Sequence, residues 1–265
     1  MIRETFNMWT ETPGEHDREI TITLCAPDRK VSRGAIVIFA GGGYTEHAHH
    51  EDIEYAEFLA SNGFFAFYVD YRCWPNVFPL PLLDARRAVR FVRSKAEIYG
   101  YDKNKIAVMG SSAGGHLAAM VSNYQEPIEL EGIDEIDNED FIPNAQILCY
   151  PVISIVKPYG HVRSGQNLLG DKYENRKEEF CIEKLVTDKT PQAFICHSSG
   201  DKSVLIQNTL NYTSEMNKNG VRSEIHIFPD GYHGMGLCIE DDKETIHTRQ
   251  WAQLLLNWLE YIDFR

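Results

Sequence analysis

The chain has 265 residues, and 26 lysines and arginines against 39 aspartates and glutamates give it a formal net charge of −13. Hydrophobic residues at 43% and charged residues at 25% are average for ordered globular proteins, so disorder is excluded as the main state. The acidic balance disfavours nucleic acid and anionic membrane surfaces as partners, and no segment has the roughly 20 consecutive apolar residues that span a bilayer.

The hydrophobic pattern switches repeatedly between the period of a strand and that of a helix. Strands are predicted over residues 19–24, 34–40, 64–69, 105–109, 145–150, 193–197 and 223–228. Helices are predicted over residues 52–62, 81–99, 114–123, 204–219 and 243–262. Because most of these strands are apolar throughout and alternate with helices, the pattern predicts an α/β fold. We expect one domain over residues 1–265, with a mostly parallel central sheet and helices on both faces.

Two polar stretches interrupt this alternation. Residues 126–140 are strongly acidic and are predicted to form a solvated excursion. Residues 157–189 are longer than an ordinary loop, and we expect them to form the rim of a site at the strand ends, or a minimal lid over it.

Residues 1–10 and the cysteines indicate the cellular compartment of the protein. Residues 1–10 lack a basic stretch followed by an apolar one, so they are not predicted to be a secretory signal. The cysteines are scattered without a C-x-x-C pair, which favours reduced, buried thiols in a cytoplasmic protein. They are Cys25, Cys73, Cys149, Cys181, Cys196 and Cys238. The sequence leaves open whether the chain forms a homo-oligomer.

A G-x-S-x-G motif spans residues 110–114, directly after a predicted strand and before a predicted helix. This strand–turn–helix context is the one that the nucleophile elbow requires, because a nucleophilic serine must stand clear of the sheet on a sharp turn. The sequence therefore predicts Ser112 as a nucleophile, while Ser111 points elsewhere and is structural.

A serine hydroxyl needs a base to take its proton, and that base must be oriented by an acid. Of the ten histidines, His233 is the best candidate, because it lies in a glycine-rich loop after the strand at 223–228. Asp201, shortly after the strand at 193–197, is the best candidate for the acid. The chain order Ser112, Asp201, His233 matches that of the α/β-hydrolase triad.

Three glycines at 41–43 end the first long buried strand, and glycines let a main chain approach a reacting centre closely. The backbone amides of Gly42, Gly43 and Ala113 are the predicted oxyanion donors. A phosphate loop is the alternative, but the stretch has neither the G-K-[ST] nor the G-x-G-x-x-G spacing of a nucleotide site.

From residue 34 to the C-terminus the chain resembles α/β-hydrolase serine esterases, especially the acetyl-xylan esterase-like branch of the carbohydrate acetyl esterases. The stretches that carry the resemblance are residues 41–44, 70–72, 82–90, 110–118 and 232–234. The resemblance implies an esterase with Ser112 as nucleophile, His233 as base and Asp201 as acid. Ala40 departs from the pattern, since many lipase-like relatives carry histidine before the glycines.

Several other residues have two interpretations each. His47, His49 and His50 form a local cluster that suggests a metal, but no further ligand falls at a regular spacing, and a polar rim is the favoured interpretation. Tyr44 and Trp74 are candidates for lining the acyl or sugar pocket, although aromatic residues are more often core.

Three further polar residues lie near the predicted site. His116 follows the nucleophile on its helix and is predicted to be a hydrogen-bonded structural residue. Asp84 and Arg72 form either a buried pair behind the site or an ordinary surface pair, and the sequence does not decide between the two.

The sequence thus predicts hydrolysis of small acyl esters through an acyl-enzyme, with acetylated sugars as the favoured substrates. The expected partner is a small-molecule ester, and no cofactor or metal is expected. A peptidase or amidase of the same fold, and a binding protein without catalytic activity, remain alternatives.

Overall fold

The structure, a computed structural model, describes every residue except 15, 17, 131, 240–242 and 244. In the part described, eight strands form one sheet in the order β1-β2-β4-β3-β5-β6-β7-β8. Strand β2 runs antiparallel to both of its neighbours, β1 and β4, and all other neighbouring pairs are parallel. The strands are β1 (Ile2–Asn7), β2 (Thr21–Ala26), β3 (Ala35–Phe39), β4 (Phe65–Val69), β5 (Ile106–Ser111), β6 (Ala145–Cys149), β7 (Gln192–Ser198) and β8 (Ser223–Phe228).

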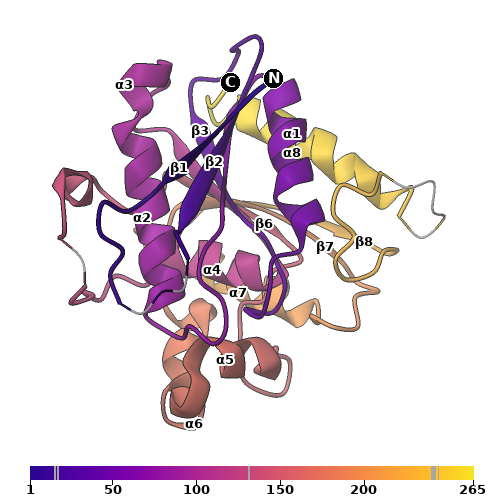
Figure 1. Cartoon of the computed structure of the whole chain (residues 1–265). Coiled ribbons are helices and arrows are strands. Elements are labelled where there is room, and N and C mark those ends of the chain that lie inside the picture. The colour runs from indigo at the N-terminus through magenta and orange to yellow at the C-terminus, as the bar shows by residue number, and fades with distance from the viewer. Residues whose placement is uncertain (15, 17, 131, 240–242, 244) are drawn as a thin grey trace.

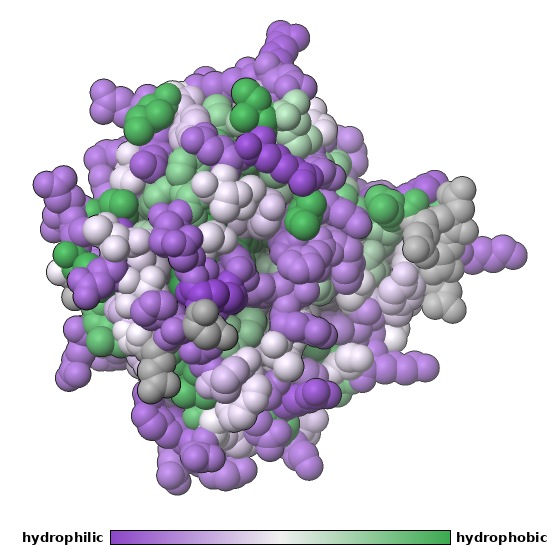
Figure 2. All heavy atoms as spheres, in the orientation of Figure 1, coloured by the Kyte–Doolittle hydropathy of each residue, from purple (hydrophilic) through white to green (hydrophobic). Residues whose placement is uncertain are grey.

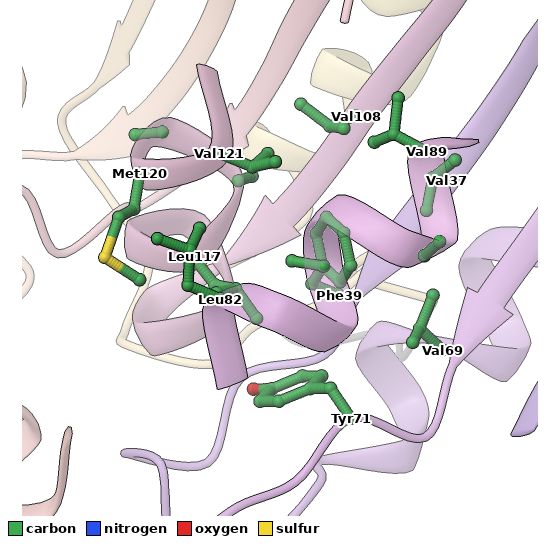
Figure 3. Packing of buried hydrophobic residues seen from close by; sticks show 14 of the residues in the cluster. Val37, Phe39, Val69, Tyr71, Leu82, Val89, Val108, Leu117, Met120 and Val121 are labelled. Carbon is green, nitrogen blue, oxygen red and sulfur yellow. The ribbon is translucent and has the colours of Figure 1, made fainter. Parts of the chain in front are cut away.

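Helices cover both faces of the sheet (Figure 1). They are α1 (Ile53–Ser61), α2 (Leu80–Ser94), α3 (Ala96–Tyr99), α4 (Ser112–Asn123), α5 (Val162–Leu169), α6 (Tyr173–Arg176), α7 (Gln207–Lys218) and α8 (Trp251–Tyr261). Successive residues of a strand point to opposite faces, and the two hydrophobic clusters follow this rule. Val37 and Phe39 pack with α2, α4 and α7, whereas Ile36 and Ile38 pack with α1 and α8. Figure 3 shows the first cluster, with Leu82 of α2 and Leu117 of α4 beside Phe39.

The predicted α/β class and its mostly parallel sheet are confirmed, with differences at the ends of elements. Strand β1, an exposed edge strand, was missed because only Phe6 in it is even partly buried and the apolar pattern is weak. The helix predicted over 81–99 is two helices separated at Lys95. The last helix begins at Trp251 rather than 243, and residue 244 of the predicted segment lies outside the described residues.

Most described residues of the acidic segment 126–140 are exposed, as expected of a solvated excursion, but the segment also has a packing role that the sequence did not show. Arg86, Arg87, Arg90 and Arg93 lie off the apolar stripe of α2, yet all four are buried, because this acidic segment covers them. Their guanidinium groups donate to its main-chain carbonyls and to two aspartates, Asp134 and Asp137. An arginine fork can satisfy several acceptors at once, so Asp134 and Asp137 are used in packing, whereas Glu126, Glu129 and Glu135 stay exposed.

The parallel strands place the candidate residues at one edge of the sheet. Ser112 follows β5, Asp201 follows β7 and His233 follows β8, and the carboxyl ends of parallel strands meet at the same edge. Helices α5 and α6, from the 157–189 stretch, lie at one end of the molecule, and both termini lie at the opposite end (Figure 1).

The visible surface is mostly hydrophilic, and the thiols are buried. Figure 2 shows hydrophilic side chains over most of the visible face, with apolar ones scattered singly, as is usual for proteins in water. No helix within the described ranges combines the length and apolar character needed to cross a bilayer. All six cysteines are buried and free, so the prediction of reduced, buried thiols is confirmed.

Candidate active site

The turn between β5 and α4 holds Ser112 in left-handed backbone geometry, with φ of 52°. Such a conformation costs a residue other than glycine on the order of 1–2 kcal/mol. The flanking glycines make the turn possible. A Cβ atom at Gly110 would lie 2.2 Å from the carbonyl oxygen of Gly114, and one at Gly114 would lie 2.1 Å from that of Phe39. The motif therefore has the steric role that the sequence predicted for it.

Ser112, His233 and Asp201 form one hydrogen-bonded chain. The distance from Ser112 Oγ to His233 Nε2 is 2.7 Å, and that from His233 Nδ1 to Asp201 Oδ2 is also 2.7 Å. Because a carboxylate only accepts, Nδ1 carries the proton and Nε2 is left free to accept one from the serine hydroxyl. This is the tautomer that a general base needs.

Asp201 is held from several sides. Its Oδ1 accepts hydrogen bonds from the amides of Ser203, at 2.9 Å, and Val204, at 3.0 Å. Its Oδ2 lies 3.4 Å from Nε2 of His197, a fully buried residue. Burial by itself would raise the pKa of Asp201, but hydrogen bonds from His197 and His233 outweigh it and hold that pKa well below its usual range. The lowered pKa favours the ionised carboxylate, the form that accepts from His233.

The glycine loop after β3 lies against the nucleophile. A Cβ atom at Gly41 would approach Ser112 Cβ to 3.1 Å, and Gly42 and Gly43 have φ of 123° and 65°. A Cβ atom at Gly42 would lie 2.1 Å from the carbonyl oxygen of Glu46, so only glycine fits there. The amide of Ala113 begins α4, where helix N–H groups have no partner within the helix. That the amides of Gly42, Gly43 and Ala113 act as oxyanion donors stays a prediction.

A cavity of about 420 Å³ opens beside Ser112 and His233. Most of the residues that line it carry polar side chains, and helix α5 and the residue before it contribute from the 157–189 stretch. The lining residues are Gly42, Gly43, Thr45, Glu46, Ala48, His50, Glu51, Ser112, His161, Arg163, Ser203, His233 and Gly234. A volume of this size matches a small ligand.

Neither aromatic residue predicted for the substrate pocket lines this cavity. Tyr44 is fully buried, with its hydroxyl 2.9 Å from Nδ1 of His116, so the prediction that it contacts substrate is corrected. Trp74 is 49% exposed and its amide donates to the carbonyl oxygen of Tyr44, which puts it behind the loop at the molecular surface. Its contact with substrate stays a prediction.

His116 is a buried structural histidine, as the sequence predicts. Its Nε2 donates to the carbonyl oxygen of Phe180 at 2.9 Å, which leaves Nδ1 to accept from Tyr44. The neutral ring satisfies both bonds, with Nε2 as donor and Nδ1 as acceptor. Burial lowers the pKa of His116 from 6.5 to about 4, although the carbonyl of Phe180 opposes this shift.

A lowered histidine pKa makes stability depend on pH. The stabilisation is fully present above the unfolded pKa of 6.5 and is lost as the pH falls from there through about 4, by up to about 3 kcal/mol. We expect His116→Gln, whose amide can donate to Phe180 and accept from Tyr44, to flatten this loss. Urea unfolding of both proteins between pH 4 and 7 measures it, and parallel pH curves would contradict the assignment.

The three clustered histidines have different environments. His47 is largely buried, between Asp70 Oδ1 at 3.1 Å and Cys73 Sγ at 3.4 Å, so for this residue the polar-rim interpretation is wrong. The side chain of His49 is 69% exposed. His50 lines the cavity, with its Nε2 donating to the carbonyl oxygen of Gly234. Among the residues that the structure describes, no group of three or more His, Cys, Asp or Glu side chains is placed to hold a metal ion.

The pair left open by the sequence is buried. Arg72 donates from Nε and Nη2 to the two carboxylate oxygens of Asp84, at 2.9 and 2.8 Å. The backbone amide of Arg72 adds a third bond, at 2.9 Å. This pair fixes the chain directly after β4, two residues from Trp74.

Glu51, Arg163 and Ser203 are among the polar cavity residues that were missed from the sequence. Glu51 is 2% exposed and accepts a hydrogen bond from the amide of Gly41. Arg163 lines the cavity from helix α5, and Ser203 lines it from the segment between β7 and α7. In the sequence all three look like ordinary acidic, basic and polar residues of loops and helix starts, so no pattern distinguished them.

Comparison with known proteins agrees with this architecture. A structure titled acetyl ester-xyloside bifunctional hydrolase, from Caldicellulosiruptor lactoaceticus, is 34% identical and superposes with a TM-score of 0.90 over 98% of this chain and 97% of the other. The carboxylesterase Cest-2923 from Lactobacillus plantarum shares the fold, with a TM-score of 0.80 over 99% of this chain and 98% of the other, at 24% identity. The topology and these neighbours define the chain as an α/β-hydrolase.

The chain belongs to the BD-FAE family, whose model matches residues 23–216. It is 32% identical to an acetylxylan esterase from Xylanibacter ruminicola over 90% of this chain and 48% of that protein. It is 31% identical to endo-1,4-beta-xylanase B from Butyrivibrio fibrisolvens over 80% of this chain and 34% of that protein. The chain therefore spans half or less of the length of these relatives. The predicted resemblance to the acetyl-xylan esterase-like branch is confirmed.

Proposed function

We propose that this chain hydrolyses small acyl esters of polar alcohols, acetylated sugars and xylo-oligosaccharides in particular. The observation that carries the proposal is the continuous hydrogen-bonded chain from Ser112 through His233 to Asp201. Ser112 and His233 line a cavity whose wall also contains Gly42 and Gly43. Nucleophile, base, orienting acid and candidate oxyanion donors thus converge on one point, which is the constellation that acyl transfer requires.

In the first half-reaction Ser112 Oγ attacks the ester carbonyl carbon while His233 Nε2 takes the hydroxyl proton. The carbonyl electron pair moves to oxygen, where the amides of Gly42, Gly43 and Ala113 stabilise the negative charge. When the intermediate collapses, the bond to the alcohol breaks, and His233 returns the proton to the departing oxygen. Asp201 stabilises the imidazolium without itself being protonated.

In the second half-reaction water replaces the alcohol. His233 removes a proton from water as its oxygen attacks the acyl-enzyme, and then protonates Ser112 Oγ as the acid leaves. Every step uses side chains and amides of this chain together with water and the ester.

Two observations support a polar alcohol. The cavity is lined by hydrogen-bonding side chains such as Thr45, Glu46, Arg163 and Ser203, which suit hydroxyl groups better than a lipid chain. The names of the relatives point the same way, since one is an acetylxylan esterase and another an acetyl ester-xyloside hydrolase. No bulky cap domain covers the described cavity, so short acyl groups on an extended alcohol are the expected substrates.

The test is a substrate panel for the purified protein. We expect release of acetate from acetylated xylo-oligosaccharides and of p-nitrophenol from p-nitrophenyl acetate, with the decanoate ester cleaved more slowly. p-Nitroacetanilide, an amide, tests the amidase alternative. A fluorophosphonate probe should label Ser112, and the mass of the labelled peptide identifies the site.

Each result has a defined meaning. Faster cleavage of the anilide than of every ester would replace the esterase by an amidase. Absence of both ester cleavage and labelling at Ser112 would favour a binding protein that has lost catalysis. Cleavage of p-nitrophenyl acetate without release of acetate from any sugar would retain the esterase and reject the proposed alcohol.

A further inference from the structure

Glu51 is a carboxylate buried in the wall of the candidate cavity. It is 2% exposed, and its Oε2 accepts a hydrogen bond of 2.9 Å from the amide of Gly41. A Cβ atom at Gly41 would lie 2.3 Å from Oε2 and 3.1 Å from Ser112 Cβ. The carboxylate therefore lies directly beneath the glycine loop and beside the nucleophile, although the proposed steps give it no part.

The other oxygen of Glu51 begins a relay of hydroxyl groups. Tyr150, whose hydroxyl donates to Oε1 at 2.8 Å, also accepts from the amide of Gly236 at 3.0 Å. The hydroxyl of Tyr55 lies 3.1 Å from that of Tyr150 and 3.0 Å from Ser111 Oγ. The side chains of Tyr150, Tyr55 and Ser111 are fully or almost fully buried, so each of these bonds is made away from water.

The direction of these bonds follows from the two backbone amides, which can only donate. If the hydroxyl of Tyr150 donates to Glu51, its oxygen can accept from Gly236 and from Tyr55. The hydroxyl of Tyr55 then accepts from Ser111. Every donor and acceptor is satisfied when Glu51 is ionised, and a fully satisfied buried network is rigid.

The network joins four segments that carry the site. Gly41 belongs to the glycine loop, Ser111 precedes the nucleophile, Tyr150 directly follows β6, and Gly236 belongs to the loop of His233. Tyr150 has strained backbone, with φ of 37°. A strained conformation persists only where its surroundings hold it, and Glu51 is the one carboxylate in this network.

Resting on the proposed ester hydrolysis, we propose that Glu51 is a positioning residue for the reaction. Its carboxylate holds the glycine loop through Gly41 and the histidine loop through Tyr150 and Gly236. The amides of Gly42 and Gly43 are thereby aimed at the oxyanion before substrate arrives, and His233 is kept in line with Ser112.

The electrostatic surroundings of Glu51 are mixed. Burial raises the pKa of Glu51, and the Tyr150 hydroxyl, His50 and the Gly41 amide lower it in part, as does His233. His50 Nε2 lies 3.8 Å from Oε1. Tyr55, Tyr150, His50 and His233 are the titratable groups that face the carboxylate from the elements around it.

Removing the carboxylate is expected to act on turnover rather than on binding. Glu51→Ala leaves the Gly41 amide and the Tyr150 hydroxyl without an acceptor, so the loops are no longer fixed to one another. Misplaced oxyanion donors cost roughly 10²–10³-fold in rate. We expect kcat for p-nitrophenyl acetate to fall by about this factor while KM changes less than about threefold.

Glu51→Gln separates geometry from charge. Its amide oxygen can accept from Gly41 and its NH₂ can donate to Tyr150, whose own hydroxyl then turns to Tyr55. The hydrogen bonds survive in reversed order, so kcat should stay within about tenfold of the parent. Because the negative charge near His233 is lost, the acid limb of the pH–rate profile should move to lower pH by about half a unit or more.

The matched control is Glu183, another buried glutamate that accepts a hydrogen bond from a tyrosine, Tyr159, at 2.7 Å. It does not line the cavity. Glu183→Ala should lower stability in urea but leave kcat within about threefold. A Tyr150→Phe variant keeps the bond between Gly41 and Glu51 but removes the bonds of the Tyr150 hydroxyl to Glu51, Tyr55 and Gly236. It should lose about tenfold in kcat.

Failure of the positioning role of Glu51 can be distinguished from failure of the proposed function. A parent protein without esterase activity refutes that function. An active parent whose folded Glu51→Ala variant keeps kcat overturns the positioning role alone. If the alanine variant does not fold, Glu51→Gln and Tyr150→Phe decide: an unchanged acid limb in the first and unchanged kcat in the second overturn the proposal.

Discussion

Replacing Ser112 with alanine is expected to lower kcat for p-nitrophenyl acetate by roughly 10⁴–10⁶-fold. The variant lacks the hydroxyl oxygen that lies 2.7 Å from His233 Nε2 and forms the acyl-enzyme, so His233 would have to activate water directly. Residual turnover from the oxyanion donors and binding alone remains, at about 10³-fold over the uncatalysed rate. Initial rates at saturating ester, corrected for background hydrolysis, measure the loss.

The matched control for this variant is Ser122→Ala in the same helix. Ser122 is fully buried and its hydroxyl donates to the carbonyl oxygen of Ala118 at 2.7 Å, so its loss tests a buried hydroxyl without chemistry. We expect its kcat to stay within about twofold of the parent. A folded Ser112→Ala protein with more than a tenth of the parental kcat would show that another group is the nucleophile.

The elements of the fold that were predicted correctly share one property, which is a strong hydrophobic period. Strand β3 is apolar throughout, and helix α1 ends before Gly63, whose φ of 89° explains the stop. Strand β1 has no such signal, because five of its six residues are exposed and its place is decided by pairing with β2. The covering of the α2 arginines by residues 126–140 is likewise tertiary, since charge alone does not say which acidic segment packs where.

The candidate site was predictable to the extent that its residues follow strands. A parallel sheet brings the carboxyl ends of β5, β7 and β8 together, so Ser112, Asp201 and His233 were predictable from chain order and local motif. Glu51 and His197 were not, because neither lies in a motif. Their importance comes from partners distant in sequence, such as Tyr150, which is 99 residues from Glu51.

Asp201→Asn is the variant with the second largest expected effect, a loss of about 10⁴-fold in kcat. The structure determines how the new amide must lie. Oδ1 of Asp201 accepts from the amides of Ser203 and Val204, so the asparagine oxygen is held there by two hydrogen bonds. The NH₂ group then faces His233 Nδ1, where a carboxylate oxygen stood.

This orientation forces the wrong tautomer on the base. Facing a donor, His233 Nδ1 must accept, which moves the ring proton to Nε2, beside Ser112, where it can no longer take the hydroxyl proton. The NH₂ group also faces Nε2 of His197, which is itself a donor because it donates to the carbonyl of Val204. The opposite orientation would place the NH₂ group against two backbone amides and is worse.

The matched control is Asp137→Asn, which alters a buried carboxylate that accepts from Arg87 and does not line the cavity. It should lower stability but keep kcat within about threefold. If Asp201→Asn lost less than tenfold in kcat while labelling by a fluorophosphonate stayed fast, His233 would not depend on Asp201 for its tautomer. Its orientation would then have to come from the surrounding loop, which is held by His50 at the Gly234 carbonyl and by Tyr150 at the Gly236 amide.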